Sequence, residues 1–327
     1  MLDTSVIDEA VAEAALDGLL APRKTLPPKL FYDDEGCRLF GEITRLPEYY
    51  PTRTELALLR RIAPEIGAGL PPGSALVEYG GSDEMKAEIL LEAAPAIDAY
   101  VPIDVAGGAL DALSARLRAS RPDLDVHPLV ADFMAPIRLP KAIAGRHLLG
   151  FFPGSTIGNL DPAQARAFLA AAGQTLGQGA TFVVGVDLRK DPAILVPAYD
   201  DAQGVTAAFN RNLLHRLNRD AAADFDPAGF AHSASWNDAQ SRIEMHLVSL
   251  RRQSVTIAGH QIFFAAGETI HTENSYKYSL AAFDDVVAES GAWRPLQRWT
   301  DPAGLFSLHL LEAAPATHRH GGFAAVT

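Results

Sequence analysis

Cysteine is scarce in this 327-residue chain, and that scarcity excludes several kinds of chemistry. A single thiol, Cys37, rules out an internal disulfide and any zinc site built from several thiolates. Its neighbours Asp33, Asp34 and Glu35 are acidic and raise the pKa of a thiol, so we expect Cys37 to be inert as a nucleophile. The ten histidines lack the H-x-x-x-H and H-E-x-x-H spacings, and the sequence therefore predicts no metal site.

Positive charge and long apolar runs are lacking too. The chain has 28 Lys and Arg against 40 Asp and Glu, a net charge of −12, whereas a nucleic-acid groove needs clustered basic side chains. No apolar run approaches the roughly 20 residues that span a bilayer. The first twenty residues carry acids where a secretory signal carries basic residues. We therefore expect no nucleic-acid partner, no membrane association and a cytoplasmic protein, and we take it to be a monomer.

The most informative pattern that is present joins a glycine turn to a later carboxylate. An apolar run at 75–77 leads into Gly80-Gly81, and a helical pattern follows. About twenty residues after the glycines, a second apolar run at 99–103 ends in Asp104. This order predicts strand, glycine turn, helix, strand and carboxylate. In an open α/β sheet, a carboxylate at the end of the second strand is placed to bind a ribose diol, which indicates an adenosine-containing cofactor.

The composition of the turn bears on which cofactor this is. A dinucleotide fingerprint needs three glycines, so that pyrophosphate can rest on a helix N-terminus. Here the turn reads Gly80-Gly81-Ser82-Asp83-Glu84, without a third glycine and with two acids. Negative charge at a helix N-terminus suits a cationic ligand such as S-adenosylmethionine better than a diphosphate. The alternative is an ordinary strand-to-helix turn whose acids only favour the first helical turn.

Strand and helix patterns alternate through the middle of the chain. Strands are predicted at 75–79, 99–103, 126–130, 147–152 and 180–187, and helices at 84–93, 107–119 and 162–175. This alternation predicts an α/β fold with a doubly wound, mostly parallel sheet. After the last of these strands the alternation breaks, which indicates a second, smaller α+β lobe.

The remaining segments complete the predicted organisation. We expect an amphipathic helix over 5–20, a helix over 53–63 that stops before Pro64, mainly helices over 192–224, hairpin strands over 240–265, a helix over 278–290 and a strand over 304–312 that returns to the sheet. The sheet domain would comprise 56–190 and 280–327, and the second lobe 1–55 and 191–279. Ligand sites favour the cleft between two such lobes.

Two other predicted strand ends carry polar groups. Asp132-Phe133 follows the third strand, where the carboxylate could bind an adenine amino group and the ring could cover the base. A capping aspartate and a core phenylalanine are the alternative. The loop 153–160 follows the fourth strand and holds Asn159, which offers both a donor and an acceptor but could equally be a turn residue.

Several segments resemble the histidine-specific Nα-methyltransferases of ergothioneine biosynthesis. They are LPPKLFYDDEGCRLFGEITRLPEYYPTRTE, GSTIGNL, AYDDAQGVTAAFNRN, RIEM and HTENS, which together span nearly the whole chain. The resemblance implies a class I methyltransferase-like fold, S-adenosylmethionine as methyl donor, no metal, and L-histidine as the small-molecule substrate. It implies trimethylation of the α-amino group to the betaine hercynine.

Cofactor positions follow from the resemblance. Gly80, Lys86 and Asp104 match positions around the methionine and ribose of the cofactor. Asp132 and Phe133 match the pair that binds adenine. The family's turn usually reads G-S-G-[ST]-S, whereas this chain has Gly80-Gly81-Ser82-Asp83-Glu84, and we expect its two acids to affect the strength of cofactor binding.

Substrate positions follow in the same way. Tyr49, Asn159 and Tyr199 match residues that hold the amino acid, and Asn159 and Tyr199 would bind its carboxylate. Glu273 and Ser275 match the pair that reads the imidazole, with Tyr49 close by.

The remaining matches surround the amine and the pocket. Tyr32 matches a tyrosine near the amine, and Tyr32 with Asn159 would be the catalytic pair. Thr206, Phe209 and Met245 match further pocket positions. Methyl transfer needs a neutral, aligned amine more than a strong base. Two alternatives are a methyltransferase for another amine or amino acid, and a catalytically silent protein that binds S-adenosylmethionine.

Overall fold

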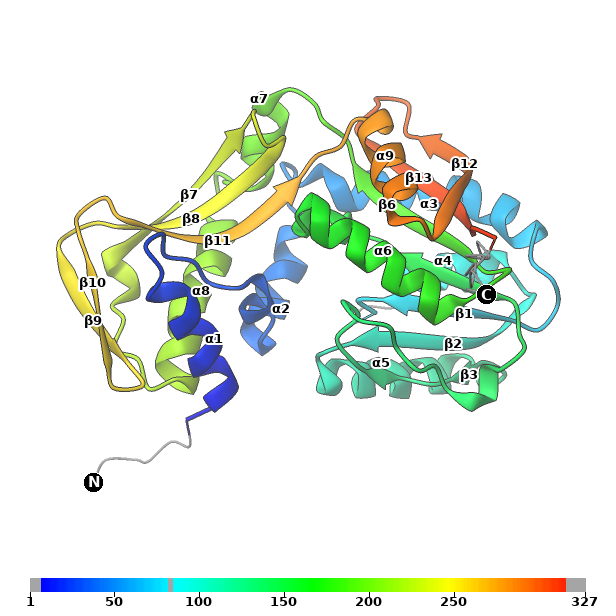
Figure 1. The fold of residues 1–327 in the computed structure, drawn as a ribbon, viewed down its shortest axis with the longest axis horizontal. Helices are drawn as coiled ribbons and strands as arrows, with labels where there is room; N and C mark the ends of the chain where they lie inside the picture. Colours follow the sequence, from blue (N-terminus) through cyan, green and yellow to red (C-terminus); the bar gives the residue numbers. More distant parts are fainter. Residues whose placement is uncertain (1–6, 82–84, 316–327) are drawn as a thin grey trace, which may run out of the picture.

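A computed structural model describes residues 7–81 and 85–315, and its largest sheet, on the right in Figure 1, has eight strands. The strands are β1 (Ser74–Tyr79), β2 (Ile97–Asp104), β3 (Asp125–Val126), β4 (Leu129–Val130), β5 (Leu148–Phe152), β6 (Thr181–Asp187), β12 (Trp293–Thr300) and β13 (Phe306–Ala313). Their order is β12-β13-β6-β5-β1-β2-β3, with β4 also paired to β2. Only β12 and β13 run antiparallel to their neighbours. The order reverses between β1 and β5, where such sheets bind ligands at the carboxyl ends of the strands.

Helices cover both faces of this sheet. They are α3 (Tyr50–Ala68), α4 (Met85–Ala93) and α5 (Gly107–Ser120) on one face, and α6 (Pro162–Leu176) and α9 (Leu280–Ser290) on the other. Short 3-10 turns, η2 (Lys141–Ile143) and η3 (Thr156–Asn159), flank β5. All six residues of β1 are buried because helices cover both of its faces, which explains its nearly continuous apolar sequence.

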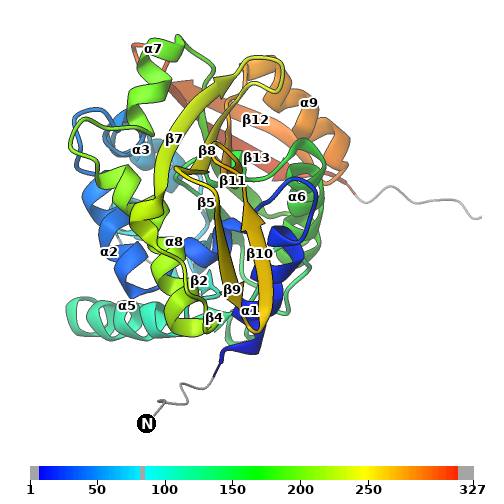
Figure 2. The same cartoon turned by 90° about the vertical axis from the view of Figure 1, so that its left-hand side faces the viewer.

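The rest of the chain builds around two smaller sheets (Figure 2). Its strands are β7 (Phe230–Asn237), β8 (Arg242–Ser249), β9 (Gln253–Ile257), β10 (His260–Phe264) and β11 (Thr269–Tyr276). Its helices and 3-10 turns are α1 (Glu9–Leu19), η1 (Pro28–Phe31), α2 (Asp34–Ile43), α7 (Pro192–Leu195), η4 (Val196–Ala198), α8 (Val205–Asp220) and η5 (Pro227–Gly229). The order β11-β8-β7 is antiparallel, and β9 and β10 form a separate hairpin.

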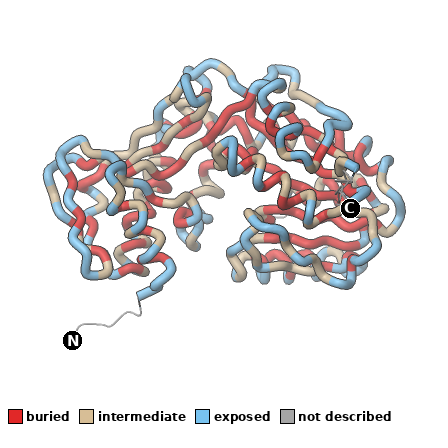
Figure 3. Tube along the Cα trace, viewed as in Figure 1, coloured by how far each residue is buried: buried red, intermediate tan, exposed pale blue. Residues whose placement is uncertain are grey.

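The buried apolar residues divide along the same lines (Figure 3). One core draws its residues from 11–50 and 195–270, and two others, on either face of the large sheet, draw theirs from 58–186 and 276–311. This division supports the predicted two-lobe organisation, whose boundaries stay a prediction. Among the described residues, no helix combines the length and apolarity needed to cross a bilayer.

The predicted doubly wound, mostly parallel sheet is confirmed, together with its helices. The predicted helix that stops before Pro64 is wrong, because α3 continues through this proline to Ala68. Pro64 and Arg60 are both exposed. Water can therefore bind the Arg60 carbonyl that Pro64 leaves without a backbone donor, while Ile62 and Ile66 keep the buried face of the helix packed.

The predicted strand 126–130 is also wrong as one element. It is split into β3 and β4, which pair with β2 on either side of Pro128. Proline has no N–H to donate to a ladder, so the pairing is interrupted there. The predicted helix over 5–20 begins at Glu9, because the Asp8 side chain caps it by accepting from Ala10 N and Val11 N.

The strands expected over 240–265 are confirmed, but the hairpin lies within 253–264, joined by Ala258 and Gly259. Both residues have positive φ, 46° and 80°, as a two-residue hairpin turn requires. Strand β8 instead pairs with β7 and β11, two strands that the sequence pattern did not reveal. The acids of the turn 82–84, residues 5 and 6 of the first predicted helix, and 316–327 of the predicted sheet domain lie outside the described residues.

Candidate active site

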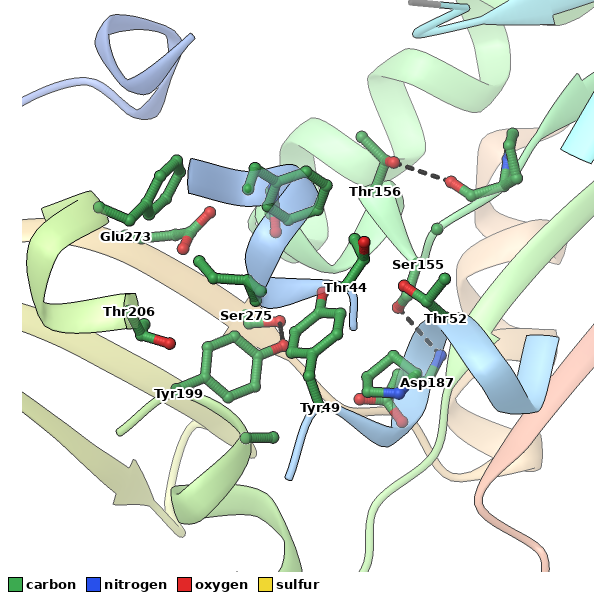
Figure 4. A pocket seen from close by; sticks show the side chains of 18 of the residues that line it. Thr44, Tyr49, Thr52, Ser155, Thr156, Asp187, Tyr199, Thr206, Glu273 and Ser275 are labelled. Atoms are coloured by element: carbon green, nitrogen blue, oxygen red, sulfur yellow. Dashed lines mark hydrogen bonds between the residues drawn. The ribbon is translucent and has the colours of Figure 1, made fainter. Parts of the chain in front are cut away.

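A pocket opens between the carboxyl ends of the large-sheet strands and the smaller antiparallel sheet (Figure 4). Nine of the predicted site residues line it: Tyr32, Tyr49, Lys86, Asn159, Tyr199, Thr206, Met245, Glu273 and Ser275. Phe209, the further predicted pocket position, lines it as well. In Figure 4, Glu273 and Thr206 lie toward one side, Asp187 and Ser155 toward the other, and Tyr49 between them. The pocket thus brings together residues that lie as much as 243 positions apart in sequence, Tyr32 and Ser275 among them.

The other four predicted residues form a row along neighbouring strand ends and do not line this pocket. Gly80 follows β1, and its amide donates to Ile103 O at 2.8 Å, which ties it to the end of β2. Asp104 ends β2, and its backbone carbonyl accepts from Ala131 N at 3.1 Å, one residue before Asp132. Gly80 has φ +77°, and among the described residues beyond its chain neighbours no atom lies within 4 Å of a would-be Cβ, so a ligand can approach the backbone there.

Local contacts also support the alternative for Asp132 and Phe133, namely a capping aspartate and a core phenylalanine. The Asp132 carboxylate accepts from Met134 N at 2.9 Å, as a capping aspartate does. Phe133 packs edge-on against Tyr79, Phe152 and Phe168, with ring centroids 5.6–6.2 Å apart. Asp132 itself is exposed, so its carboxylate can also meet a ligand from solvent.

A buried carboxylate anchors the end of the pocket nearest β1 and β5. Glu55 on α3 is fully buried and accepts from Gly154 N at 2.8 Å and from Lys86 Nζ at 2.6 Å. The loop carrying Gly154 and the helix carrying Lys86 are therefore held at one point. Gly185 lets the carboxylate lie there, because a Cβ at that position would come within 2.3 Å of Glu55 Oε1.

The loop between β5 and α6 is held in an unusual backbone conformation. Gly154 and Ser155 both have positive φ, 79° and 53°, and the latter is costly for a residue with a side chain. Ser155 Oγ accepts from Asp187 N at 2.9 Å, which fixes the loop to the end of β6. Gly158 lies so close to β11 that a Cβ would meet Tyr276 O at 2.8 Å. These contacts position Asn159 at the pocket.

A second buried carboxylate, Asp187, lies at the end of β6 beside the same loop. Asp187 accepts from Tyr50 Oη at 2.7 Å, from Lys190 Nζ at 2.6 Å and from Lys277 Nζ at 2.6 Å. Burial alone would raise its pKa, but the two ammonium groups hold the pKa of Asp187 below its ordinary value. Burial lowers the pKa of Lys190 to about 8, although the negative charge of Asp187 acts to raise it.

The same cluster reaches two predicted substrate residues. Lys277 Nζ donates to Tyr199 Oη at 2.7 Å and to Ser275 Oγ at 2.9 Å, and these two hydroxyls lie 2.8 Å apart. Burial raises the pKa of the Tyr199 and Tyr49 phenols well above the ordinary value, so both are neutral at pH 7. They are therefore hydrogen-bonding groups and not bases.

Glu273 is the contrasting carboxylate of the pocket. Its residue is 8% exposed, and no other described residue donates a hydrogen bond to its carboxylate. Burial raises the pKa of Glu273 to about 7, while Lys277 acts in the opposite direction. Glu273 and Ser275 project to the same pocket from alternate positions of β11, as an extended strand requires.

Aromatic rings form much of the wall. Tyr32, Phe40 and Phe209 lie with ring centroids 6.1–6.2 Å apart, Phe40 and Tyr49 6.3 Å, and Tyr49 and Tyr199 6.2 Å. All five line the pocket. Ring faces attract organic cations, so this wall suits a quaternary ammonium group.

Sequence reasoning missed Glu55, Asp187 and Lys277. A signal existed for two of them: Glu55 occupies an apolar face of its helix with Leu58 and Leu59, and Asp187 ends a strand that is otherwise apolar. Nothing local marked Lys277. Partial desolvation of its thiol, together with the charges of Asp104 and Asp33, raises the pKa of Cys37, which agrees with the predicted inertness. No group of three His, Cys, Asp or Glu side chains within 7–81 and 85–315 could hold a metal ion.

Comparisons with known proteins agree on the family. Residues 11–313 match the family described as histidine-specific, S-adenosylmethionine-dependent methyltransferases. The histidine N-alpha-methyltransferase of Mycolicibacterium smegmatis is 44% identical over 308 residues, which cover 92% of this chain and 94% of that protein. Ergothioneine biosynthesis protein 1 of Neurospora crassa is 33% identical over 208 residues, 60% of this chain and 23% of that protein.

A solved structure bears on the fold. The S-adenosylmethionine-dependent methyltransferase of Clostridium acetobutylicum superposes with a TM-score of 0.53 at 10% identity, covering 85% of this chain and 99% of that one. This likeness confirms the class I methyltransferase fold. With the family match over nearly its whole length, the chain belongs to the histidine-specific, S-adenosylmethionine-dependent methyltransferases.

Proposed function

We propose that this protein methylates the α-amino group of L-histidine three times and yields hercynine, a step of ergothioneine biosynthesis. The observation that carries the proposal is the Glu273 carboxylate. It is buried, receives no hydrogen bond from the described residues, and faces an aromatic-walled pocket beside Ser275. A buried acceptor without a partner is costly unless a ligand donates to it, and an imidazole N–H is such a donor.

The strand ends fit S-adenosylmethionine, which supplies an activated methyl group when bound. Asp104 would hold the ribose diol, and Asp132 with Phe133 the adenine. Gly80 leaves the backbone open to the ligand, and Lys86 would face the methionine part. The row that these residues form along neighbouring strands supports one elongated ligand, and the row ends beside the pocket.

The pocket supports recognition of all three polar parts of histidine. Glu273 and Ser275 would take the imidazole, while Asn159 and Tyr199 would take the carboxylate. Tyr32 would lie by the amine, and as a neutral hydroxyl it would orient the amine instead of abstracting its proton. Alignment of a neutral amine can lower a barrier by roughly 7–11 kcal/mol, so no strong base is required.

The aromatic wall supports repeated methylation. Each methyl group makes the amine larger and finally fixes its positive charge. Tyr32, Phe40, Tyr49 and Phe209 offer ring faces instead of a carboxylate, so the trimethylammonium product is stabilised without being held by an ion pair. We propose that the enzyme is a monomer and that it acts in the cytoplasm.

Mass spectrometry of the product tests the proposal. Purified protein incubated with L-histidine and S-adenosylmethionine should yield trimethylated histidine, with three S-adenosylmethionine consumed per product. A protein that binds S-adenosylmethionine but leaves histidine unmethylated contradicts the proposal. Methylation of another amino acid in preference to histidine would also contradict it.

A further inference from the structure

Lys277 lies directly beneath the pocket but cannot touch a ligand there. Its side chain is completely buried, and its ammonium group uses all three N–H donors: to Asp187, to Tyr199 and to Ser275. Its Nζ also lies 4.8 Å from the centroid of the Tyr199 ring. Any influence of Lys277 on a substrate must therefore pass through the two hydroxyls.

The charge of Lys277 is only partly neutralised. Asp187 is its ion-pair partner at 2.6 Å, but Asp187 also receives Lys190 at 2.6 Å and the Tyr50 hydroxyl at 2.7 Å. One carboxylate thus serves two ammonium groups. The charge of Lys277 also acts on Glu273, but no ion pair joins these two side chains. Positive charge therefore remains behind the Tyr199–Ser275 pair.

The hydroxyl hydrogens of this pair can be counted. Tyr199 and Ser275 each accept from Lys277, so neither can donate to it. The hydroxyls lie 2.8 Å apart, so one donates to the other. Of their two hydrogens, one is used in this bond and one remains for the pocket. The pair therefore presents a single O–H donor with an ammonium group behind it, and such charge-assisted donors favour an anionic acceptor.

We propose that Lys277 is a positioning residue that, together with Ser275, makes Tyr199 a directed donor for the α-carboxylate of the substrate. This inference rests on the proposed function, because it takes the substrate to be an amino acid. Asp187 holds Lys277 in place and connects it, through Ser155 Oγ, to the loop that carries Asn159. The α-carboxylate of the substrate would thus bind Tyr199 and Asn159, and both residues are held by the same buried cluster around Asp187.

The test compares two ligands that differ only in the carboxylate. L-Histidine and L-histidinamide are titrated calorimetrically into the wild-type protein and into Lys277→Met, with S-adenosylhomocysteine present. The wild type should prefer histidine, and Lys277→Met should reduce this preference about tenfold or more, as expected for a lost charge-assisted bond. Lys190→Met is the matched control: it also removes an ammonium group from Asp187 but contacts neither hydroxyl, and it should change the preference less than about threefold.

Each other outcome has a distinct meaning. If Lys277→Met weakens both ligands equally, or if Lys190→Met changes the preference as much, Lys277 is merely structural and the inference falls. If the wild type binds histidine no better than its amide, the inference alone falls; if it binds neither, the proposed function falls with it. Should Lys277→Met not fold, Lys277→Gln keeps a donor without the charge, and the same loss of preference is expected.

Discussion

Two buried carboxylates at the same pocket are treated in opposite ways. Asp187, at the end of β6 in the large sheet, receives donors from Tyr50, Lys190 and Lys277, and its pKa is held below the ordinary value. Glu273, on β11 of the smaller sheet, receives none from the described residues, and its pKa is raised to about 7. The protein thus satisfies one acid completely and leaves the other for a ligand.

The difference assigns the two acids different roles: Asp187 stabilises the structure, and Glu273 is available to bind a ligand. A carboxylate with several fixed donors stabilises the surrounding structure but has no capacity left for a substrate. A buried carboxylate without fixed donors is costly to ionise, and a ligand that donates a hydrogen bond to it offsets that cost. The two acids therefore predict opposite responses to mutation and pH.

The largest effect is expected from neutralising Asp187. Asp187→Asn leaves Lys190 and Lys277 buried without their anion and should lower the free energy of unfolding by about 3–5 kcal/mol. Urea unfolding at pH 8 measures this, with Glu273→Gln as the control that should not be destabilised. A loss below about 1 kcal/mol would show that the cluster is not the support described here.

The next largest effect is a pH dependence of stability that has opposite signs for Glu273 and Asp187. Burial raises the pKa of Glu273 from 4.5 unfolded to about 7 folded, so its contribution to stability is present below pH 4.5 and is lost as the pH rises through 7. Glu273→Gln removes this loss. The variant should be more stable than the wild type by less than about 1 kcal/mol at pH 5 and by up to about 3 kcal/mol at pH 8.

Guanidinium unfolding of both proteins at several values between pH 5 and pH 8 gives the comparison. Asp187 has the opposite effect. Because its pKa is lower in the folded state than in the unfolded state, its contribution to stability is lost at acidic pH, as the pH falls through the folded pKa. Parallel stability curves for the wild type and Glu273→Gln would contradict a buried, unsatisfied Glu273.

A smaller effect should separate the two ends of the site. Asp104→Ala should weaken S-adenosylmethionine binding by about 1.5–3 kcal/mol, the range for a lost hydrogen bond to a charged group. It should leave histidine binding to the cofactor-loaded protein nearly unchanged. Titration calorimetry measures both affinities, and unaltered cofactor affinity with an intact fold would remove Asp104 from the cofactor site.

Local patterns predicted the large sheet well, because Gly80 directly follows the buried strand β1 and Asp104 ends the next strand, β2. They failed where long-range pairing outweighs local preference. Strand β12 contains Pro295, which is tolerated at a bulge on the sheet edge. Strand β7, FAHSASWN, is too polar to be recognised by propensity.

The residues of the site also divide into those that the sequence indicated and those that only the folded structure reveals. Glu273 and Ser275 were predicted only through resemblance to a family, because nothing local distinguishes HTENS from a surface strand. Asp187 and Lys277 were missed because the two lie 90 positions apart and acquire meaning only as a pair. A sequence pattern reports local periodicity, whereas a buried ion pair is a property of the completed fold.

The central claim is that Glu273 reads the imidazole, and the specificity of Glu273→Ala tests it most directly. The kcat/KM for L-histidine and for L-tryptophan is measured in the wild type and the variant. Loss of the acceptor leaves an imidazole N–H unpaired, at a cost of about 1–3 kcal/mol, and makes the pocket more tolerant of an indole. The account predicts a fall in the histidine-to-tryptophan ratio by roughly tenfold or more, and an unaltered ratio would contradict it.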